Sequence, residues 1–360
     1  MRPLRLIFPA ILFFITLFGL LRLFEEFKNR SSYTIKSHDN GKGAIKSFEV
    51  LREGPLDVFP FKHQFGALPL FEIRSRLSKD GKTIYDVTYD LDEYGFRKVP
   101  RIHAGKEQEH LIITPDSFIF GEGLNAQETL PGILEEELPL FNAYNFSYMG
   151  GGVNTLLRFM DLVSLKPLVK EPKGMMIYVV IHDHLARWAA RASYMSWVNS
   201  NYPHYEIEKG MPVYKGPLQD QEFYKAYKAL EQAGLKNTML HVAGATHPDA
   251  KWSETEMEGF LLGLKQVEQK YLSQFPDGRF YFVFHPLYGG PPEVMELLES
   301  KARAMNFQVL NPHPVFFPML AHYGNNNFAF KIPEDGHPNR RANEFFANWL
   351  MKELKLKKAH

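Results

Sequence analysis

The sequence predicts an α/β fold: a three-layer α/β/α sandwich around a mainly parallel five-stranded sheet, with an N-terminal membrane helix and a small β-rich extension. Three observations lead to this prediction. Buried-strand patterns alternate with helical patterns over residues 109–360, which is typical of a parallel sheet covered by helices. Residues 1–30 contain a charge-free apolar run, and residues 31–108 combine a polar linker with short alternating segments. We therefore expect three parts with these boundaries.

Five short segments carry the pattern of buried strands. The first, Leu111-Ile-Ile-Thr114, is a run of leucine and β-branched residues that ends at a proline, as suits a central parallel strand. The other four cover residues 140–146, 175–181, 280–285 and 307–310. Helical patterns cover residues 221–232, 254–275 and 341–356. In the extension, residues 71–76 and 83–89 alternate and flank a Lys-Asp-Gly turn signal, which predicts a hairpin.

The apolar run at residues 6–21 follows Arg2 and Arg5 and ends before Arg22. A helix that spans a bilayer needs about 20 residues, and arginine side chains can reach the interface at its ends. No Ala-x-Ala cleavage pattern follows, so we favour an uncleaved single-pass anchor over a signal peptide. Basic residues on both flanks orient this anchor only weakly. We expect everything after Arg30 to lie on one side of the membrane, in the periplasm or otherwise outside the cytoplasm.

Composition excludes several classes of function. A net charge of +1 gives no argument for a nucleic-acid partner. The absence of cysteine rules out disulfides, thiol catalysis and cysteine-ligated zinc, and it fits an oxidising compartment.

The segment from Gly121 to Ala126 mimics a dinucleotide fingerprint, but several residues separate it from the first strand, so nucleotide binding is a minor alternative. We predict no cofactor and no metal.

Two candidate site segments follow the first two strands. Asp116 and Ser117 come directly after the first strand, at the edge where open α/β sheets bind ligands. Gly150 and Gly152 bound a run of three glycines after the second strand, where a backbone N–H can meet a bound oxygen. Taken alone, each segment is also explained as an ordinary turn.

Two further segments bring histidines and carboxylates. His182 and His184 end the third strand; such a pair can hold a metal, but a third ligand is not evident. Glu334, Asp335 and His337 fall in a turn before the last helix, where a capping role is the ordinary explanation. A serine hydroxyl needs a general base near neutral pH, and a histidine oriented by a carboxylate provides one.

Together and in this order, the four segments resemble the blocks of the SGNH (GDSL-type) hydrolases, which are esterases of a flavodoxin-like α/β fold. Pro115-Asp-Ser-Phe-Ile-Phe-Gly121 resembles the family's Gly-Asp-Ser block, which implies that Ser117 is the nucleophile. The segment from Asn145 to the three glycines resembles the glycine block, which implies that Gly150 is an oxyanion donor.

The last block, Asp335-Gly-His337, resembles the family's Asp–His block and implies that His337 is the base, oriented by Asp335. Glu334 stands at the longer spacing and is the reserve carboxylate. The family usually has Asn-Asp in its third block, so here His182 or His184 would have to donate to the oxyanion. The segment at residues 93–97 is also similar to one that precedes the serine in membrane-attached members.

The resemblance implies a membrane-anchored serine ester hydrolase. Its substrate would be a small-molecule, glycan or lipid ester, for example an O-acyl group of an envelope glycan or lipid. Two alternatives stay open. One is an O-acyltransferase with the same triad. The other is a non-catalytic binding or assembly protein on a decayed fold, which is suggested by Pro115 in place of the family's usual glycine and by the missing Asn of the third block. The tyrosine-rich stretch at residues 197–250 could wall a substrate groove or simply pack. The sequence does not fix an oligomeric state.

Overall fold

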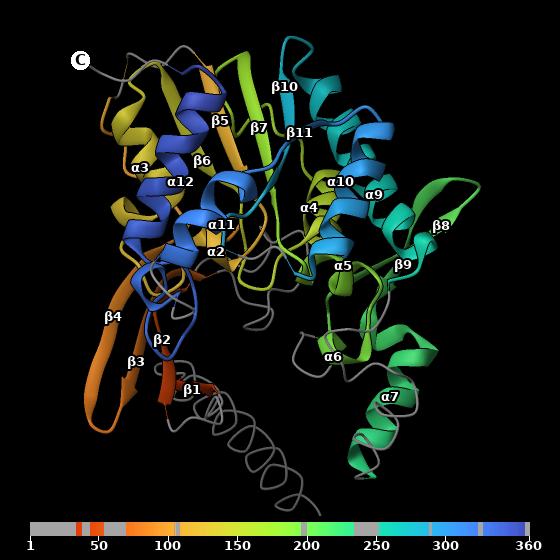
Figure 1. The fold of residues 1–360 in the computed structure, drawn as a ribbon. Coiled ribbons are helices and arrows are strands. Elements are labelled where there is room, and N and C mark those ends of the chain that lie inside the picture. The colour runs from red at the N-terminus through yellow and green to blue at the C-terminus, as the bar shows by residue number, and fades with distance from the viewer. Residues whose placement is uncertain are drawn as a thin grey trace, which may run out of the picture.

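A five-stranded parallel sheet forms the centre of the computed structural model, which describes residues 34–37, 44–53, 70–103, 105, 109–195, 200–233, 252–287, 290–322 and 327–356 (Figure 1). Its strands are β5 (Glu109–Thr114), β6 (Phe141–Asn145), β7 (Lys173–Val180), β10 (Arg279–Phe284) and β11 (Gln308–Leu310). They lie in the order β11-β10-β7-β5-β6, and every neighbouring pair is parallel. This is the flavodoxin-like order: β6 is added on one side of β5, and β7, β10 and β11 are added on the other, so the strand order reverses between β5 and β7. All five predicted strands are confirmed.

Helices cover both faces of the sheet (Figure 1). One face packs against α3 (Leu130–Glu137) and α12 (Arg340–Glu353), and the other against α4 (Val153–Leu162), α9 (Glu254–Gln274) and α10 (Pro292–Ala304). Successive side chains of β5 alternate between the two cores: Ile112 belongs to one, Leu111 and Ile113 to the other. Because both faces are covered, the inner strands β5, β7 and β10 contain nearly continuous apolar runs. The predicted three-layer sandwich is confirmed.

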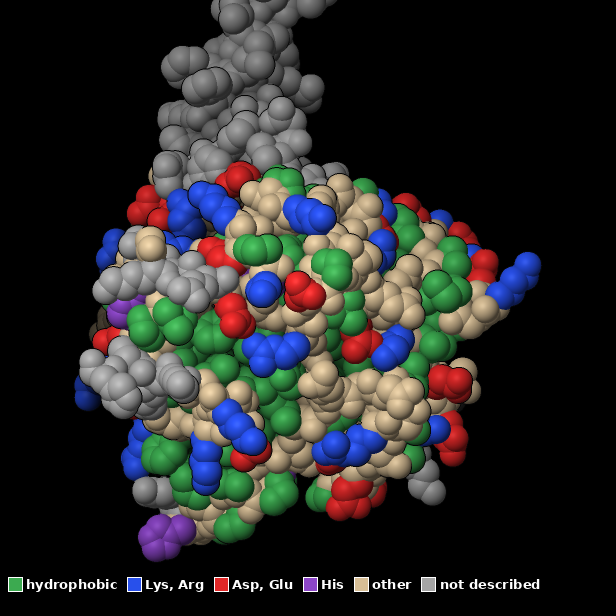
Figure 2. Space-filling model, turned by 90° about the horizontal axis from the view of Figure 1, so that it is seen from above, with side chains coloured by type: hydrophobic (Ala, Val, Ile, Leu, Met, Phe, Trp, Pro, Cys, Tyr) green, Lys and Arg blue, Asp and Glu red, His purple; other side chains and the backbone are tan. Residues whose placement is uncertain are grey.

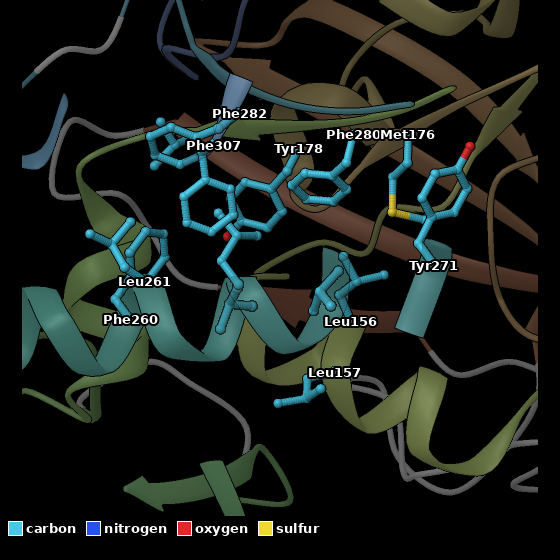
Figure 3. Packing of buried hydrophobic residues seen from close by; sticks show 14 of the residues in the cluster. Leu156, Leu157, Met176, Tyr178, Phe260, Leu261, Tyr271, Phe280, Phe282 and Phe307 are labelled. Atoms are coloured by element: carbon cyan, nitrogen blue, oxygen red, sulfur yellow. The ribbon is translucent and has the colours of Figure 1, made fainter. Parts of the chain in front are cut away.

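The larger core is rich in aromatic side chains (Figure 3). Tyr178 of β7 and Phe282 of β10 stack with ring centroids 6.3 Å apart, and Phe260 of α9 lies edge-on to Tyr178 at 6.2 Å. Helix α9 can approach closely because it carries a glycine at its contact: a Cβ on Gly263 would lie 2.6 Å from Trp188. The high aromatic content of the sequence is therefore used largely in packing.

The N-terminal extension is an antiparallel sheet of β1 (Thr34–Ser37), β2 (Ala44–Glu53), β3 (Leu70–Lys79) and β4 (Lys82–Asp90). The predicted hairpin is β3–β4. The core of this sheet includes four side chains from the α/β domain, namely Phe120, Leu124, Met149 and Ile332. Each of these residues lies within a few positions of a predicted site segment. The extension therefore packs on the carboxyl edge of the parallel sheet.

The remaining elements surround this frame. They are α2 (Ser117–Phe120), α5 (Asp183–Trp188), α6 (Ala192–Met195), the hairpin β8 (Pro203–Glu208) and β9 (Met211–Pro217), α7 (Glu222–Gln232), α11 (His313–His322), and the 3₁₀ turns η1 (Ala126–Glu128), η2 (Leu218–Asp220) and η3 (Asn327–Phe330). Tyr202, Tyr205 and Tyr224 are buried in this region, which supports the packing interpretation of the tyrosine-rich stretch.

The predicted membrane anchor, residues 1–30, lies outside the described residues. Within the ranges that the structure describes, no helix has both the length and the apolar character needed to cross a membrane. On the face shown in Figure 2, lysine and arginine side chains are interspersed with aspartate and glutamate. That face therefore presents no continuous field of one sign, which agrees with the net charge of +1.

Candidate active site

Ser117 is the first residue of α2, which follows β5. It lies at the point where the order of strands in the sheet reverses. Asp116 caps this helix: its Oδ1 accepts hydrogen bonds from the N–H groups of Phe118 (3.1 Å) and Ile119 (3.3 Å). The Pro115 carbonyl accepts a hydrogen bond from the Tyr148 N–H at 3.0 Å, which ties this turn to the glycine loop. Ser117 therefore sits at the carboxyl edge, where the sequence predicted it.

His337 lies in a turn immediately before α12, and its backbone is fixed by that turn. Its carbonyl accepts a hydrogen bond from Ile332 at 2.8 Å, and Gly336 takes a φ of +90°, which favours glycine. The His337 ring points at α2, with Nε2 2.9 Å from Ser117 Oγ. The fold thus brings together a hydroxyl and an imidazole that are 220 residues apart in sequence.

Asp335 is the carboxylate that orients His337. Its Oδ1 accepts a hydrogen bond from the ring nitrogen Nδ1 and a longer one, 3.3 Å, from the His337 backbone N–H. Glu334 instead extends to the surface, where it forms an ion pair with Lys79 of β3 at 2.9 Å. Asp335, the carboxylate that the resemblance implied, is therefore the one in contact with the His337 ring, whereas Glu334 pairs with Lys79.

Two residues that the sequence analysis missed complete the cluster. Lys46 of β2 places its Nζ 2.6 Å from Asp335 Oδ2 and 2.6 Å from Glu122 Oε1. Glu122 follows α2, and its Oε2 lies 3.4 Å from His337 Nε2. A signal for Lys46 did exist: Ala44 and Phe48, two positions on either side, are buried, so the alternation of the strand directs a lysine inward.

Neighbouring charges control the protonation of the pair. Burial alone would lower the pKa of His337, but the carboxylates of Glu122 and Asp335 outweigh burial and raise that pKa above its ordinary value. Burial alone would raise the pKa of Asp335, but His337 and Lys46 hold it well below its usual range. Asp335 is thus a stable anion beside an imidazole of increased basicity.

The glycine loop supplies a candidate donor for an oxyanion. The Gly151 N–H donates to the Tyr148 carbonyl at 2.9 Å, and the Gly152 N–H donates to Thr155 Oγ1 at 3.0 Å. Gly151 also packs so closely that a Cβ would lie 2.0 Å from the Pro115 oxygen. Gly150 has a φ of +76°. Among the described residues, its N–H, unlike those of Gly151 and Gly152, donates to no backbone or side-chain acceptor. It remains the predicted backbone donor.

The two histidines after β7 take different places. His184 is fully buried: its Nδ1 accepts a hydrogen bond from the Ile181 N–H, so its Nε2 carries the proton and donates to Asp116 Oδ2 at 3.1 Å. Both ring nitrogens are therefore engaged, and the suggestion that His184 donates to an oxyanion is wrong. Its place is behind the nucleophile, where it fixes the capping residue of α2.

His182 packs beside Trp252, whose Nε1 donates to His182 Nε2 at 2.9 Å. Because indole nitrogen only donates, the proton of the neutral His182 ring is on Nδ1. Burial lowers the pKa of His182, which favours this neutral form. Within the described part of the chain, His182 forms no hydrogen bond or ion pair with Ser117 or His337, and an oxyanion role for it stays a prediction.

Arg97 holds the segment that follows the nucleophile. It is buried, and its guanidinium donates to the carbonyls of Phe120 (2.9 Å), Gly121 (2.7 Å) and Leu124 (2.6 Å). The glycine at 121 is needed for close packing, because a Cβ there would lie 2.2 Å from a Thr129 methyl group. The fingerprint-like segment is thus occupied by protein contacts, which argues against nucleotide binding.

The described residues contain no group of three or more His, Asp or Glu side chains arranged to hold a metal ion. Fold and site together define the class of protein: an α/β/α sandwich of flavodoxin-like order with a Ser–His–Asp arrangement at the carboxyl edge of its sheet. No protein-family model matches the chain, and no curated protein matches it.

Several solved structures are similar to this chain at low identity and low TM-score. A member of the lipolytic G-D-S-L family from Veillonella parvula is 12% identical, with 69% of this chain and 98% of that chain covered and a TM-score of 0.39. An acetyl xylan esterase from Butyrivibrio proteoclasticus is 8% identical over 80% of this chain and 71% of that chain, with a TM-score of 0.39. A carbohydrate esterase is 10% identical over 90% and 96%, with a TM-score of 0.36. Because these identities and TM-scores are low, the assignment of function rests on this chain's own residues.

Proposed function

We propose that this protein is a serine ester hydrolase that works through an acyl-enzyme on Ser117. One observation carries the proposal: the His337 ring lies between Ser117 Oγ, 2.9 Å from Nε2, and the Asp335 carboxylate on Nδ1. A general base must lie within about 2.6–3.2 Å of the atom whose proton it takes, and this separation falls in that range. The buried anion on the far nitrogen keeps the lone pair of Nε2 directed at the hydroxyl.

The reaction follows from this arrangement. Ser117 Oγ attacks the ester carbonyl while His337 Nε2 takes its proton, which gives a tetrahedral oxyanion. The N–H groups of Ser117 and Gly150 are the proposed donors to that oxyanion. The imidazolium then protonates the leaving alcohol as the carbon–oxygen bond breaks. Water, deprotonated by His337, attacks the acyl-enzyme, releases the carboxylic acid and restores Ser117.

The substrate class and the location are part of the same proposal. An apolar run at residues 6–21 supports a membrane anchor with the α/β domain outside the cytoplasm, and we propose an O-acyl group on an envelope glycan or lipid as the ester. If the acyl group passed to another hydroxyl in place of water, the same residues would catalyse acyl transfer. Nothing in the geometry favours that acceptor over water.

Hydrolysis of p-nitrophenyl acetate and p-nitrophenyl butyrate by the full-length chain tests the proposal. We expect turnover that disappears in Ser117→Ala and His337→Ala, while the two variants melt at the wild-type temperature. Glu334→Gln serves as the matched control on the same turn. Turnover that persisted in Ser117→Ala would refute the assignment of the nucleophile. Acyl transfer to an added glycan without release of free acid would change the proposed reaction to a transferase.

A further inference from the structure

The N-terminal extension reaches the catalytic cluster through Lys46. This lysine is on β2, yet its Nζ lies 2.6 Å from Asp335 Oδ2, the carboxylate oxygen that does not bond the His337 ring. Tyr85 of the neighbouring strand β4 also donates to that oxygen, at 3.3 Å. We propose that Lys46 is a positioning residue of the active site, so that the N-terminal extension contributes to catalysis through its contact with Asp335. The inference rests on the proposed function.

The first argument is geometric. A carboxylate that bonds the histidine through one oxygen can still rotate about its own axis, and a second contact on the other oxygen removes that freedom. Lys46 supplies this contact to Asp335, whose side chain is 1% exposed. The direction of the His337 ring toward Ser117 depends on Asp335, so a residue that fixes Asp335 also fixes the approach of the base.

The second argument is the balance of charge. Lys46 Nζ lies between two buried carboxylates, Asp335 and Glu122, at 2.6 Å from each. Breaking a buried ion pair by removing one partner leaves an uncompensated charge, which is strongly unfavourable. Without Lys46, two anions would face one imidazole with no cation between them. Glu122 would then compete more strongly with Ser117 for His337 Nε2, from which its Oε2 is only 3.4 Å away.

The groups that face His337 come from four elements. Asp335 lies on its own turn, Glu122 on the loop after α2, Lys46 on β2, and Ser117 at the start of α2. Phe118 packs edge-on against the His337 ring at 5.1 Å. Lys46 is the cation in this set, and it opposes the two carboxylates that raise the pKa of His337. Its loss should therefore be visible in the titration of the ring.

The test compares four variants of the full-length chain. Lys46→Met removes the charge and keeps the length of the side chain, whereas Lys46→Arg keeps the charge. The double variant Lys46→Met/Glu122→Gln removes one cation and one anion, so the net charge beside His337 equals that of the wild type. Lys79→Met is the matched control, because Lys79 is also an extension lysine and pairs with Glu334, next to Asp335, without touching the cluster. Hydrolysis of p-nitrophenyl acetate gives kcat, KM and the pH profile, and NMR titration gives the His337 pKa.

We expect Lys46→Met to lower kcat by up to about 100-fold with little change in KM, as small displacements of a catalytic group do. The acid limb of the pH profile should move up by about one pH unit, the size of effect that one nearby charge has. Lys46→Arg should recover much of kcat, the double variant should move the limb back toward that of the wild type, and Lys79→Met should match the wild type.

Wild-type kcat and pH profile in Lys46→Met would overturn the proposal. Equal losses in Lys46→Met and Lys79→Met would also overturn it, because they would indicate a general effect of the extension. If Lys46→Met fails to fold, the folded double variant and Glu122→Gln decide, since these two differ only in Lys46: the same His337 pKa in both contradicts the charge argument. A wild-type chain without Ser117-dependent hydrolysis refutes the proposed function instead, and the NMR titration still reports on Lys46.

Discussion

Asp335→Asn changes the charge behind His337 while keeping the shape of the side chain. In the wild-type arrangement, Asp335 Oδ1 accepts the proton on His337 Nδ1, so Nε2 is unprotonated and faces Ser117 Oγ at 2.9 Å. An asparagine can turn its amide N–H toward Nδ1, which then becomes the acceptor and moves the ring proton to Nε2. A protonated Nε2 cannot take the proton of Ser117.

The expected magnitude follows from that change of tautomer. The equivalent exchange in another serine triad lowers kcat by about 10⁴-fold, which is about 5.5 kcal/mol of activation free energy. Glu334→Gln is the control, because Glu334 pairs with Lys79 at the surface. A surface ion pair contributes only about 0–1 kcal/mol to stability and nothing to the orientation of the ring. We expect its kcat to stay within about twofold of wild type, a range that such a weak pair allows.

The assay is steady-state hydrolysis of p-nitrophenyl acetate by the full-length chain at a fixed pH, with thermal melts of both variants. The reasoning is refuted if Glu334→Gln loses turnover and Asp335→Asn keeps it, because the orienting role would then belong to Glu334. If both variants keep full activity and Ser117→Ala has none, His337 works without a carboxylate partner, and the role given to Asp335 is wrong.

Three further predictions concern pH, stability and the boundary of the folded part. Turnover should rise with pH through an apparent pKa above the ordinary value for histidine, because only neutral His337 accepts a proton. Glu122→Gln should shift this limb to lower pH, because Glu122 is the carboxylate that raises the pKa of His337 most, and an unchanged limb would contradict the contact between the two side chains. Arg97→Met should lower the melting temperature by several degrees, since each lost hydrogen bond from a charged group costs about 1.5–3 kcal/mol, and a melt unchanged within error would show that the buried guanidinium is dispensable. A chain that begins at Ser31 should fold and melt cooperatively; an insoluble or non-cooperative product would make the preceding segment part of the fold.

The fold could be predicted because its signals are local. The inner strands of the parallel sheet are buried on both faces, so each contains a short apolar run, such as residues 111–114 of β5. Ser117, Asp335 and His337 were also candidates from the sequence, since each lies in a short segment that resembles a known block. Their contact across 220 residues followed from the order of the blocks and from the rule that site residues meet at the carboxyl edge.

The rest of the site depends on tertiary contacts that leave little trace in a short segment. Lys46 reaches Asp335 only because the extension packs its β2 strand over the carboxyl edge, a placement that strand alternation does not specify. The third block left either His182 or His184 as the oxyanion donor, but the place of His184 is decided by Asp116, which lies 68 residues away in sequence. Position along the chain predicted where polar residues gather, and packing decided which of them face the reaction.

The central claim is that Ser117 is a nucleophile activated by His337. The most direct measurement is mass spectrometry of the full-length chain after reaction with a fluorophosphonate probe, followed by peptide mapping. The account predicts a single adduct on Ser117, formed in the wild type and in Lys79→Met and absent from Ser117→Ala and His337→Ala. No adduct on the folded wild-type chain, or an adduct on any other serine, would contradict it.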